Sequence, residues 1–371
     1  MRFPEFEGEW ENCAFSDIGT FSKGIGISKE QLTEDGTPCI LYGELYTKYK
    51  NEVIKEVKNK TSINANGLVF SKVNDVIIPS SGETAIDIST ACCVMLDNIL
   101  LGGDLNIIRP EKHNGSFISY QLNGKRKYDI AKIAQGSSII HLYNDSLKKI
   151  KLNVPNNIKE EEKIVSLLSR IDDRISTQSQ IIEELKAQKI ALRNKLYEQI
   201  TRIGESEQIV NLLTYEQPTN YIVTNTDYSN ETSLIPVLTA NKAFILGYID
   251  ENFGIYNKGE CIIFDDFTMD LKYVDFQFKV KSSAIKILTA KQGVNLRFIY
   301  EYLSFLKLTS ADHKRHYISE IEPRYISLPE IDIQNNTANV LLITDKKISL
   351  EIKQYYLLVK QKKYLLQQMF I

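Results

Sequence analysis

The sequence lacks the short motifs of the common nucleotide-binding and hydrolytic enzymes. It contains no GxxxxGK-Ser/Thr phosphate loop, which argues against a Walker-type ATPase. None of its 9 prolines is adjacent to another, which excludes the Pro-Pro motif typical of amino-directed DNA methyltransferases. The nucleophile elbow GxSxG is absent, and Gly24 and Gly26 are not completed as GxGxxG. We therefore expect no catalytic residues in this chain.

Metal, disulfide and membrane signals are also lacking. The 5 cysteines are odd in number and form no CxxC, which favours reduced, mostly buried thiols. His313 and His316 could share a helix face, but no carboxylate or thiol has the spacing to complete a metal site. No apolar run approaches the roughly 18 residues that span a bilayer, and the first residues lack the blocks of a signal peptide. These features predict a cytoplasmic protein without a bound metal.

The chain also has no large excess of positive or of negative charge. The chain has 45 Lys and Arg against 47 Asp and Glu, so a strongly basic protein that binds nucleic acid alone is not expected. Hydrophobic residues make up 43% of the chain and charged residues 25%, which is typical of globular proteins. A length of 371 residues predicts two or three domains.

Heptad periodicity predicts two long helices. Residues 160–199 contain neither Pro nor Gly, and aliphatic residues recur there every seven positions in two rows offset by four. The same pattern returns from about residue 334 to the end of the sequence. We expect the two helices to pair as a coiled coil. The predicted seam consists of Ile164, Leu168, Ile171, Ile175, Ile182, Leu185, Leu192 and Leu196 in the first helix and of Leu341, Ile348, Tyr355, Leu358, Leu365 and Met369 in the second.

The two helices are copies of one another at an offset of 173 positions. Identical residues in this register include Asp172 with Asp345 and Lys189 with Lys362. Two unrelated heptad helices would share some residues by composition alone, but a lysine on the apolar seam of both copies argues for a true repeat. A lysine on such a seam costs stability and can fix register or orientation. We expect antiparallel pairing, which would place the two preceding domains at opposite ends.

Each helix follows a segment in which short β-branched runs alternate with turn residues, the pattern of a mixed α/β domain. The predicted fold class is α+β, with two tandem mixed α/β domains, each followed by a long helix, and an internal pseudo-two-fold repeat. The expected division is a first domain at 1–157, a helix at 158–203, a second domain at 204–332 and a helix at 333–371.

Several short sequence motifs, together with the two-copy layout, resemble those of a known protein family. They are residues 2–6 (RFPEF), 8–11 (GEWE), 17–24 (DIGTFSKG), 135–137 (QGS), 171–175 (IDDRI), 315–318 (RHYI) and 326–329 (ISLP). Together they resemble the specificity (S) subunits of type I restriction–modification systems, and the likeness extends over essentially the whole chain. The starts of the two helices, at residues 160–164 and 334–339, depart from the pattern of that family.

The resemblance implies a DNA-recognition role without catalysis. Each mixed α/β segment would be a target recognition domain that reads one half of an asymmetric, bipartite site in double-stranded DNA. The helices would set the gap between the half-sites and dock two methyltransferase (M) subunits, with restriction and translocase (R) subunits added to the complex. S-adenosylmethionine, ATP and magnesium would then belong to the partner subunits, and this chain would hold no cofactor.

Candidate DNA contacts are polar residues in loops that can reach base edges, together with cations that meet phosphates. A solvated helix face or tyrosines used only for packing would explain many of them equally well. In the first domain the candidates are Lys23, Tyr42, Tyr46, Lys48, Ser80, Ser81, Gly82, Gln135, Ser137 and Ser138. In the second domain they are Thr239, Asn241, Lys242, Asp265, Asp266, Phe267, Lys314, Arg315 and His316.

Two other readings of the sequence stay open at this point. One is a DNA methyltransferase or nuclease with fused recognition domains, against which the missing motifs argue. The other is a coiled-coil scaffold without DNA binding, which would leave two similar recognition-sized domains unexplained.

Overall fold

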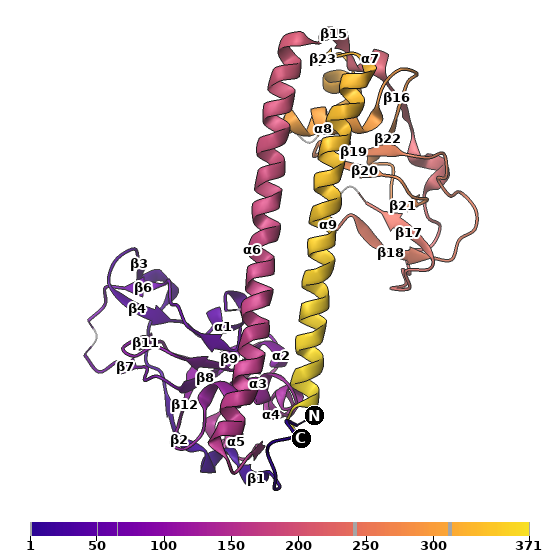
Figure 1. Ribbon diagram of the computed structural model, residues 1–371. Helices are drawn as coiled ribbons and strands as arrows, with labels where there is room; N and C mark the ends of the chain where they lie inside the picture. Colours follow the sequence, from indigo (N-terminus) through magenta and orange to yellow (C-terminus); the bar gives the residue numbers. More distant parts are fainter. Residues whose placement is uncertain (1, 50, 65, 240–242, 311–313, 371) are drawn as a thin grey trace. The chain divides into compact units, whose positions relative to one another are not determined.

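The computed structural model describes residues 2–49, 51–64, 66–239, 243–310 and 314–370. The chain divides into two compact units. Unit 1 is Met1–Gln180 with Lys353–Ile371, and unit 2 is Ile181–Ile352. Each unit therefore contains one globular part and a section of both long helices, because the helix ends pack on the globular parts (Figure 1).

Unit 1 is built on two mixed five-stranded sheets. The strand order of the first sheet is β2 (Gly19–Lys23), β12 (Leu105–Pro110), β8 (Asp75–Pro79), β10 (Cys92–Val94) and β5 (Val53–Ile54). The strand order of the second sheet is β3 (Leu32–Thr33), β6 (Lys60–Thr61), β4 (Thr37–Ile40), β11 (Leu100–Leu101) and β7 (Val69–Phe70). Two strand pairs complete it: β1 (Glu11–Ala14) with β14 (Lys151–Val154), and β9 (Ser81–Gly82) with β13 (Ile140–His141). The short helices are η1 (Phe15–Asp17), η2 (Lys29–Gln31), α1 (Glu44–Thr47), α2 (Ala85–Ile88), α3 (Gly115–Asn123), α4 (Lys127–Ile133) and α5 (Asn144–Leu147).

Unit 2 repeats this plan with fewer strands. A four-stranded sheet has the order β16 (Leu213–Glu216), β22 (Ile285–Ala290), β19 (Cys261–Asp265), β20 (Leu271–Val274), and a three-stranded sheet has the order β18 (Ile245–Ile249), β17 (Ile235–Leu238), β21 (Lys279–Val280). Strand β15 (Glu205–Gln208) pairs with β23 (Tyr325–Leu328). The short helices are α7 (Ile209–Leu212), η3 (Pro218–Tyr221), α8 (Leu296–Phe305) and the π-helical turn η4 (Tyr317–Ile321).

The two globular parts place equivalent elements in equivalent positions. Strand β8 is buried along its whole length between β12 and β10, as β19 is between β22 and β20. Helix α3 is capped by Asn114, whose side chain accepts from the backbone N–H groups of the first turn, and α8 is capped in the same way by Asn295. The repeat that is evident in the helices therefore extends through the domains.

The two predicted long helices are α6 (Ile158–Ile203) and α9 (Ile331–Gln368). In unit 1, Ile164 and Leu168 of α6 share a core with Leu365 and Met369 of α9. In unit 2, Ile200 of α6 lies in one core with Leu341 of α9. Early residues of α6 thus meet late residues of α9, which confirms the antiparallel pairing. All fourteen predicted seam residues are buried or half-buried.

All 5 cysteines are free, and four of them are buried. Among the described residues, no helix combines the length and the apolar character that a membrane crossing requires.

Leu341→Ala tests the seam within unit 2. Leu341 is fully buried in the core that α6 and α9 share with α8. The truncation should lower the free energy of unfolding by about 2–5 kcal/mol, because it removes buried methyl groups and leaves a cavity. The matched control is Leu350→Ala on the same helix, where the side chain is 66% exposed and the change should stay within about 0.5 kcal/mol. Urea denaturation measures both, and equal effects would contradict the seam assignment.

Candidate nucleic-acid interface

The structure joins two predicted DNA-contact segments of unit 1 into one edge. Strand β13 pairs with β9, with Ile140 opposite Gly82 and His141 opposite Ser81. The backbone of Gln135 exchanges hydrogen bonds with that of His141 at 2.9 and 2.7 Å. The loop of Gln135 to Ser138 therefore lies beside Ser80–Gly82, the segment that follows the buried strand β8. We call Lys23, Ser80–Gly82 and Gln135–Tyr143 the first edge.

Aromatic side chains complete the first edge. The Lys23 ammonium lies 5.8 Å from the ring centre of Tyr143. Tyr46 lies next to Gly82, where a Cβ would be in ordinary contact with its hydroxyl oxygen at 3.5 Å and would collide with the Ile88 side chain. Gly136 has a φ of +129°, and a Cβ at this position would collide with the Ile139 carbonyl, so the tight turn requires glycine.

Exposure separates the candidates of the first edge into two groups. Lys23, Gln135, Ser137 and Ser138 are exposed and stay candidates for DNA contact. Ser80 and Ser81 are buried, while Tyr46 and Gly82 are half-buried. Sequence reasoning missed two exposed apolar residues of this edge, Ile139 at 59% and Tyr143 at 46%. The sequence feature that could have pointed to them is the position of large apolar side chains after a polar turn.

Tyr42 and Lys48 belong to a different part of unit 1. They line an open groove of about 820 Å³, together with Lys29, Gln31 and Asn59. The buried Glu44 carboxylate organises one wall, since it accepts from Lys48 Nζ at 2.7 Å and from the amide of Asn59. An open groove of this kind suits an extended ligand rather than an enclosed small molecule.

Unit 2 forms an equivalent edge, which is held together by carboxylates that bind backbone N–H groups and not by strand pairing. The Asp265 carboxylate at the end of β19 accepts from the backbone N–H groups of Phe267 and Thr268 at 2.8 and 3.0 Å. The Asp266 carboxylate accepts from the backbone N–H groups of His316 and Tyr317 at 3.1 and 2.9 Å. Asp266 thereby fixes the segment 314–317 beside the strand end. We call Asp265–Phe267 with residues 314–317 the second edge.

The second edge also divides its candidates. Asp265, Asp266 and His316 are buried, and both carboxylates are occupied by backbone N–H groups, so they shape the edge rather than face solvent. Lys314 and Arg315 are exposed, and Phe267 is half-buried. Among the other candidates Thr239 is buried, while Asn241 and Lys242 lie outside the described residues.

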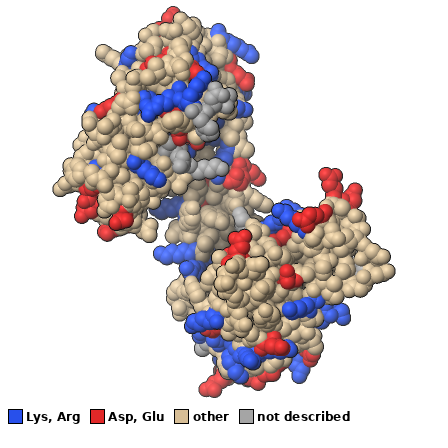
Figure 2. Space-filling model, turned by 180° about the vertical axis from the view of Figure 1, so that it is seen from behind, with Lys and Arg blue, Asp and Glu red and all other residues tan. Residues whose placement is uncertain are grey.

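Surface charge on the face seen in Figure 2 is mixed. Lys and Arg side chains are interspersed with acidic ones there. This agrees with the formal net charge of −2 for the chain.

A buried lysine joins the helices to the globular part in unit 1. Lys362 of α9 forms ion pairs with Asp172 of α6, at 2.5 Å, and with Glu52 of the globular part. The hydroxyl of Tyr120, on α3, donates to Asp172 at 2.6 Å. Burial raises the pKa of Glu52 above its ordinary value. Although burial lowers the pKa of Lys362, attraction to Glu52 and Asp172 outweighs it, so the net shift is upward. We call this group the first junction.

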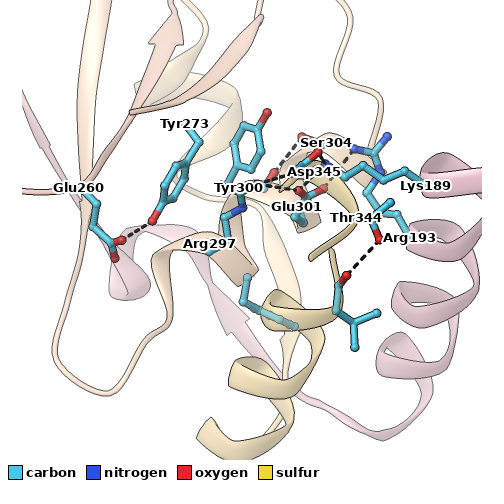
Figure 3. A network of polar contacts seen from close by, with 12 residues as sticks. Lys189, Arg193, Glu260, Tyr273, Arg297, Tyr300, Glu301, Ser304, Thr344 and Asp345 are labelled. Carbon is cyan, nitrogen blue, oxygen red and sulfur yellow. Dashed lines mark hydrogen bonds and ion pairs between the residues drawn. The ribbon is translucent and has the colours of Figure 1, made fainter. Parts of the chain in front are cut away.

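Unit 2 contains the corresponding group, the second junction (Figure 3). Lys189 of α6 lies 2.8 Å from the Asp345 carboxylate of α9 and 2.7 Å from that of Glu301 on α8. Arg193 approaches Glu301 at 3.3 Å, and Arg297 is paired with Asp345. Arg297 also stacks on Tyr273, whose hydroxyl donates to Glu260.

The two junctions differ in charge balance. The first has one ammonium for two carboxylates, whereas the second has three cations for two carboxylates. Glu301 occupies the position in α8 that Tyr120 has in α3, counted from the capping asparagine. The two copies thus share the lysine and the aspartate and differ in the groups around them.

The sequence of the first half matches a known family. Residues 7–187 match the family model of the type I restriction modification DNA specificity domain. Residues 7–187, just under half of the chain, therefore resemble this domain family in sequence. The specificity subunit of the Escherichia coli type I restriction enzyme EcoR124I/EcoR124II is 48% identical over 121 residues, which are 31% of this chain. A putative specificity subunit of Haemophilus influenzae, S.HindORF215P, is 32% identical over 163 residues, 42% of this chain. The matched segments span 30% and 38% of these relatives, about a third of their length.

Solved structures extend the likeness in fold to the full length of the chain. The type I S subunit from M. genitalium matches with a TM-score of 0.64 and covers 100% of this chain and 99% of its own, at 14% identity. A chain from a structure on complex assembly and conformational transition of the type I R-M system gives a TM-score of 0.58, with coverage of 98% and 97%, at 11% identity. These matches confirm the fold of two tandem domains with long helices.

Matched glutamate variants test the charge balance of the two junctions. Glu52→Gln removes the surplus negative charge and leaves the Lys362–Asp172 pair, so it should change the free energy of unfolding by less than about 1 kcal/mol at pH 7. Glu301→Gln leaves buried cations short of a partner and should cost about 3 kcal/mol. Denaturant unfolding measures both variants, and equal losses would contradict this account.

The pH dependence follows from the raised pKa of Glu52. A carboxyl whose pKa is raised by folding stabilises the folded state below its unfolded pKa, and this contribution is lost as the pH rises through the folded pKa. Because glutamine mimics the protonated form, Glu52→Gln should gain stability relative to the parent chain as the pH rises above about 4.5. Glu301→Gln serves as the control in the same titration.

Proposed function

We propose that this chain is the DNA sequence-recognition subunit of a cytoplasmic type I restriction–modification complex. One globular part reads each half of an asymmetric, bipartite site, and the helices set the gap and dock two methyltransferase subunits. Restriction subunits join the same complex. The chain itself performs no catalysis, and S-adenosylmethionine, ATP and magnesium belong to its partners.

The observation that carries the proposal is the pair of equivalent edges. In each unit the loop after the buried central strand is joined to a segment that precedes the last strand, by β13–β9 pairing in unit 1 and by Asp266 in unit 2. A reader of two half-sites needs two such surfaces, and different half-sites need different side chains on them. The edges meet both requirements, with Gln135, Ser137 and Ser138 on one and Lys314 and Arg315 on the other.

Methylome sequencing tests the proposal. A host that carries this chain with its partner methyltransferase should methylate one bipartite sequence, and a host with the methyltransferase alone should not. Methylation or cleavage of DNA by the purified chain alone would favour the reading as a fused enzyme. The absence of any DNA binding, with or without the methyltransferase, would favour a scaffold.

Arg315→Ala tests the second edge. If Arg315 contacts a phosphate, binding should weaken on all sequences and the salt slope should fall by roughly one unit. If it contacts a base, the preference for the correct base at one position of one half-site should weaken by about 1–3 kcal/mol. In either case the half-site that the first edge reads should not change. Arg174→Ala, an exposed arginine of α6, is the control, and an effect equal to that control would remove Arg315 from the interface.

The outward side of α9 supports the docking part of the proposal. Ile343, Leu350, Leu357 and Tyr364 recur every seven residues and are 67%, 66%, 59% and 54% exposed. The exposed lysines Lys346, Lys353 and Lys360 follow this row with the same spacing. An apolar row flanked by lysines fits an amphipathic helix with acidic flanks. The equivalent residues of α6 are Arg170, Thr177, Glu184 and Ala191, which are mostly polar.

Leu350→Glu with Leu357→Glu tests docking on this row. The new charges should repel an acidic partner and remove its apolar contact, so a complex with two methyltransferase subunits should lose one of them. Native mass spectrometry measures the stoichiometry. Thr177→Glu with Ala191→Glu places two acids at equivalent positions of α6 and is the control. If the α9 variant still binds two subunits with unchanged affinity, the row is not the docking surface.

A further inference from the structure

The two junction lysines are related to each other by the repeat. Lys362 is the copy of Lys189, and Asp345 is the copy of Asp172, each 173 positions later. Each lysine pairs with the aspartate of the other helix copy: Lys362 of α9 with Asp172 of α6, and Lys189 of α6 with Asp345 of α9. The pairing is therefore reciprocal, as a two-fold arrangement of two equal helices requires.

The aliphatic seam alone does not specify one register. Its residues recur every seven positions, so sliding one helix by seven residues would again place aliphatic side chains opposite each other. In each helix the aspartate precedes the lysine by the same interval, from Asp172 to Lys189 and from Asp345 to Lys362. Both pairs form at one antiparallel register. A slide by one heptad breaks both at once and moves each lysine by about 10 Å.

Burial makes such a slide unfavourable. The Lys362 residue is 9% exposed and Asp172 is 4% exposed. In the second junction the Lys189 side chain is 13% exposed and Glu301 is fully buried. A buried charge that loses its partner is strongly destabilising, so the shifted registers are disfavoured even where aliphatic side chains face each other again.

The second carboxylate in each junction, a glutamate, ties the register to the globular part. Glu52 belongs to the globular part of unit 1 and Glu301 to that of unit 2, and each bonds the lysine of its unit. A lysine held in register therefore also holds its globular part at one position along the helices.

We infer that Lys189 and Lys362 are positioning residues that select a single register of α6 against α9 and thereby fix the gap between the two half-sites. This inference rests on the proposed function, in which the helices separate two readers. It adds that two buried lysines, and not the apolar seam, select one gap length.

The test removes both ionic pairs while keeping the seam apolar. The neutralised-seam variant carries Lys189→Met, Asp345→Asn, Lys362→Met, Asp172→Asn and Glu52→Gln. Methionine has nearly the volume of lysine, and Glu301 keeps Arg193 and Arg297 as partners. Two controls each neutralise one junction, either Lys189→Met with Asp345→Asn or Lys362→Met with Asp172→Asn and Glu52→Gln. Each control retains one reciprocal pair.

Two measurements are made on the full chain with its methyltransferase partner. Methylome sequencing reads the gap length and both half-sites. Electron paramagnetic resonance measures the distance between spin labels on cysteines introduced at Thr177 and Gln361, two exposed positions of unit 1 outside the docking row, in a Cys13→Ser background. Because the other cysteines are buried, the labels report on the two helices.

The parent chain and both controls should show one gap and one distance. The neutralised-seam variant should show additional gaps, displaced by about three base pairs for each heptad slide, and a second distance population, with unchanged half-sites. A single unchanged gap and distance in this variant would overturn the inference. If the parent chain directs no bipartite methylation, the proposed function is wrong. The distance measurement still tests whether the lysines select one register of the helices.

A second pair of variants covers the case in which the neutralised-seam variant does not fold. Lys362→Asp alone places a third carboxylate in the first junction and should abolish methylation. Adding Asp172→Lys and Glu52→Gln restores a lysine–aspartate pair in the reverse direction and should recover the parental gap and distance. Failure of this reversed pair to restore them would also overturn the inference.

Discussion

One buried lysine in each junction joins the two long helices to the globular part of its unit. It bonds an aspartate of the opposite helix and a glutamate of the globular part, so one ammonium holds three segments that are distant in sequence. Apolar contacts along the seam supply most of the cohesion, but they repeat every seven residues and lack direction. A buried charge that loses its partner is strongly destabilising, and on this ground we infer that the lysines select the register.

The two edges have the same position in their units but are held together by different interactions. In unit 1 a short strand pair holds the polar turn beside the central strand, and in unit 2 buried carboxylates bind the backbone of the neighbouring segment. The scaffold is thus conserved between the copies while the exposed side chains differ. For a reader of two unlike half-sites this separation is useful, because the loops can change without disturbing the sheet that carries them.

Much of the candidate site was accessible to sequence reasoning, and the errors have a common cause. The positions of the loops could be predicted because they follow buried β-branched strands such as Asp75–Pro79. The exposure of single residues could not. Asp265 and Asp266 have the composition of a solvent-facing polar loop, yet their oxygens accept backbone N–H groups that no pattern in the sequence reveals. Ile139 and Tyr143 look like core residues in the sequence, yet both are exposed beside the turn.

The two heptad helices, their offset of 173 residues, the two-domain layout and the place of a lysine on each apolar seam can all be predicted from the sequence. These features depend on local periodicity and on comparison of the chain with itself, which need no knowledge of distant contacts. The carboxylates that meet the lysines become evident only from the folded chain, because Glu52 and Glu301 come from unrelated positions of the two domains. The folded chain also decides which loop residues face solvent. Both outcomes follow from the packing of segments far apart in sequence, where burial and hydrogen-bond partners are set by neighbours that periodicity does not reveal.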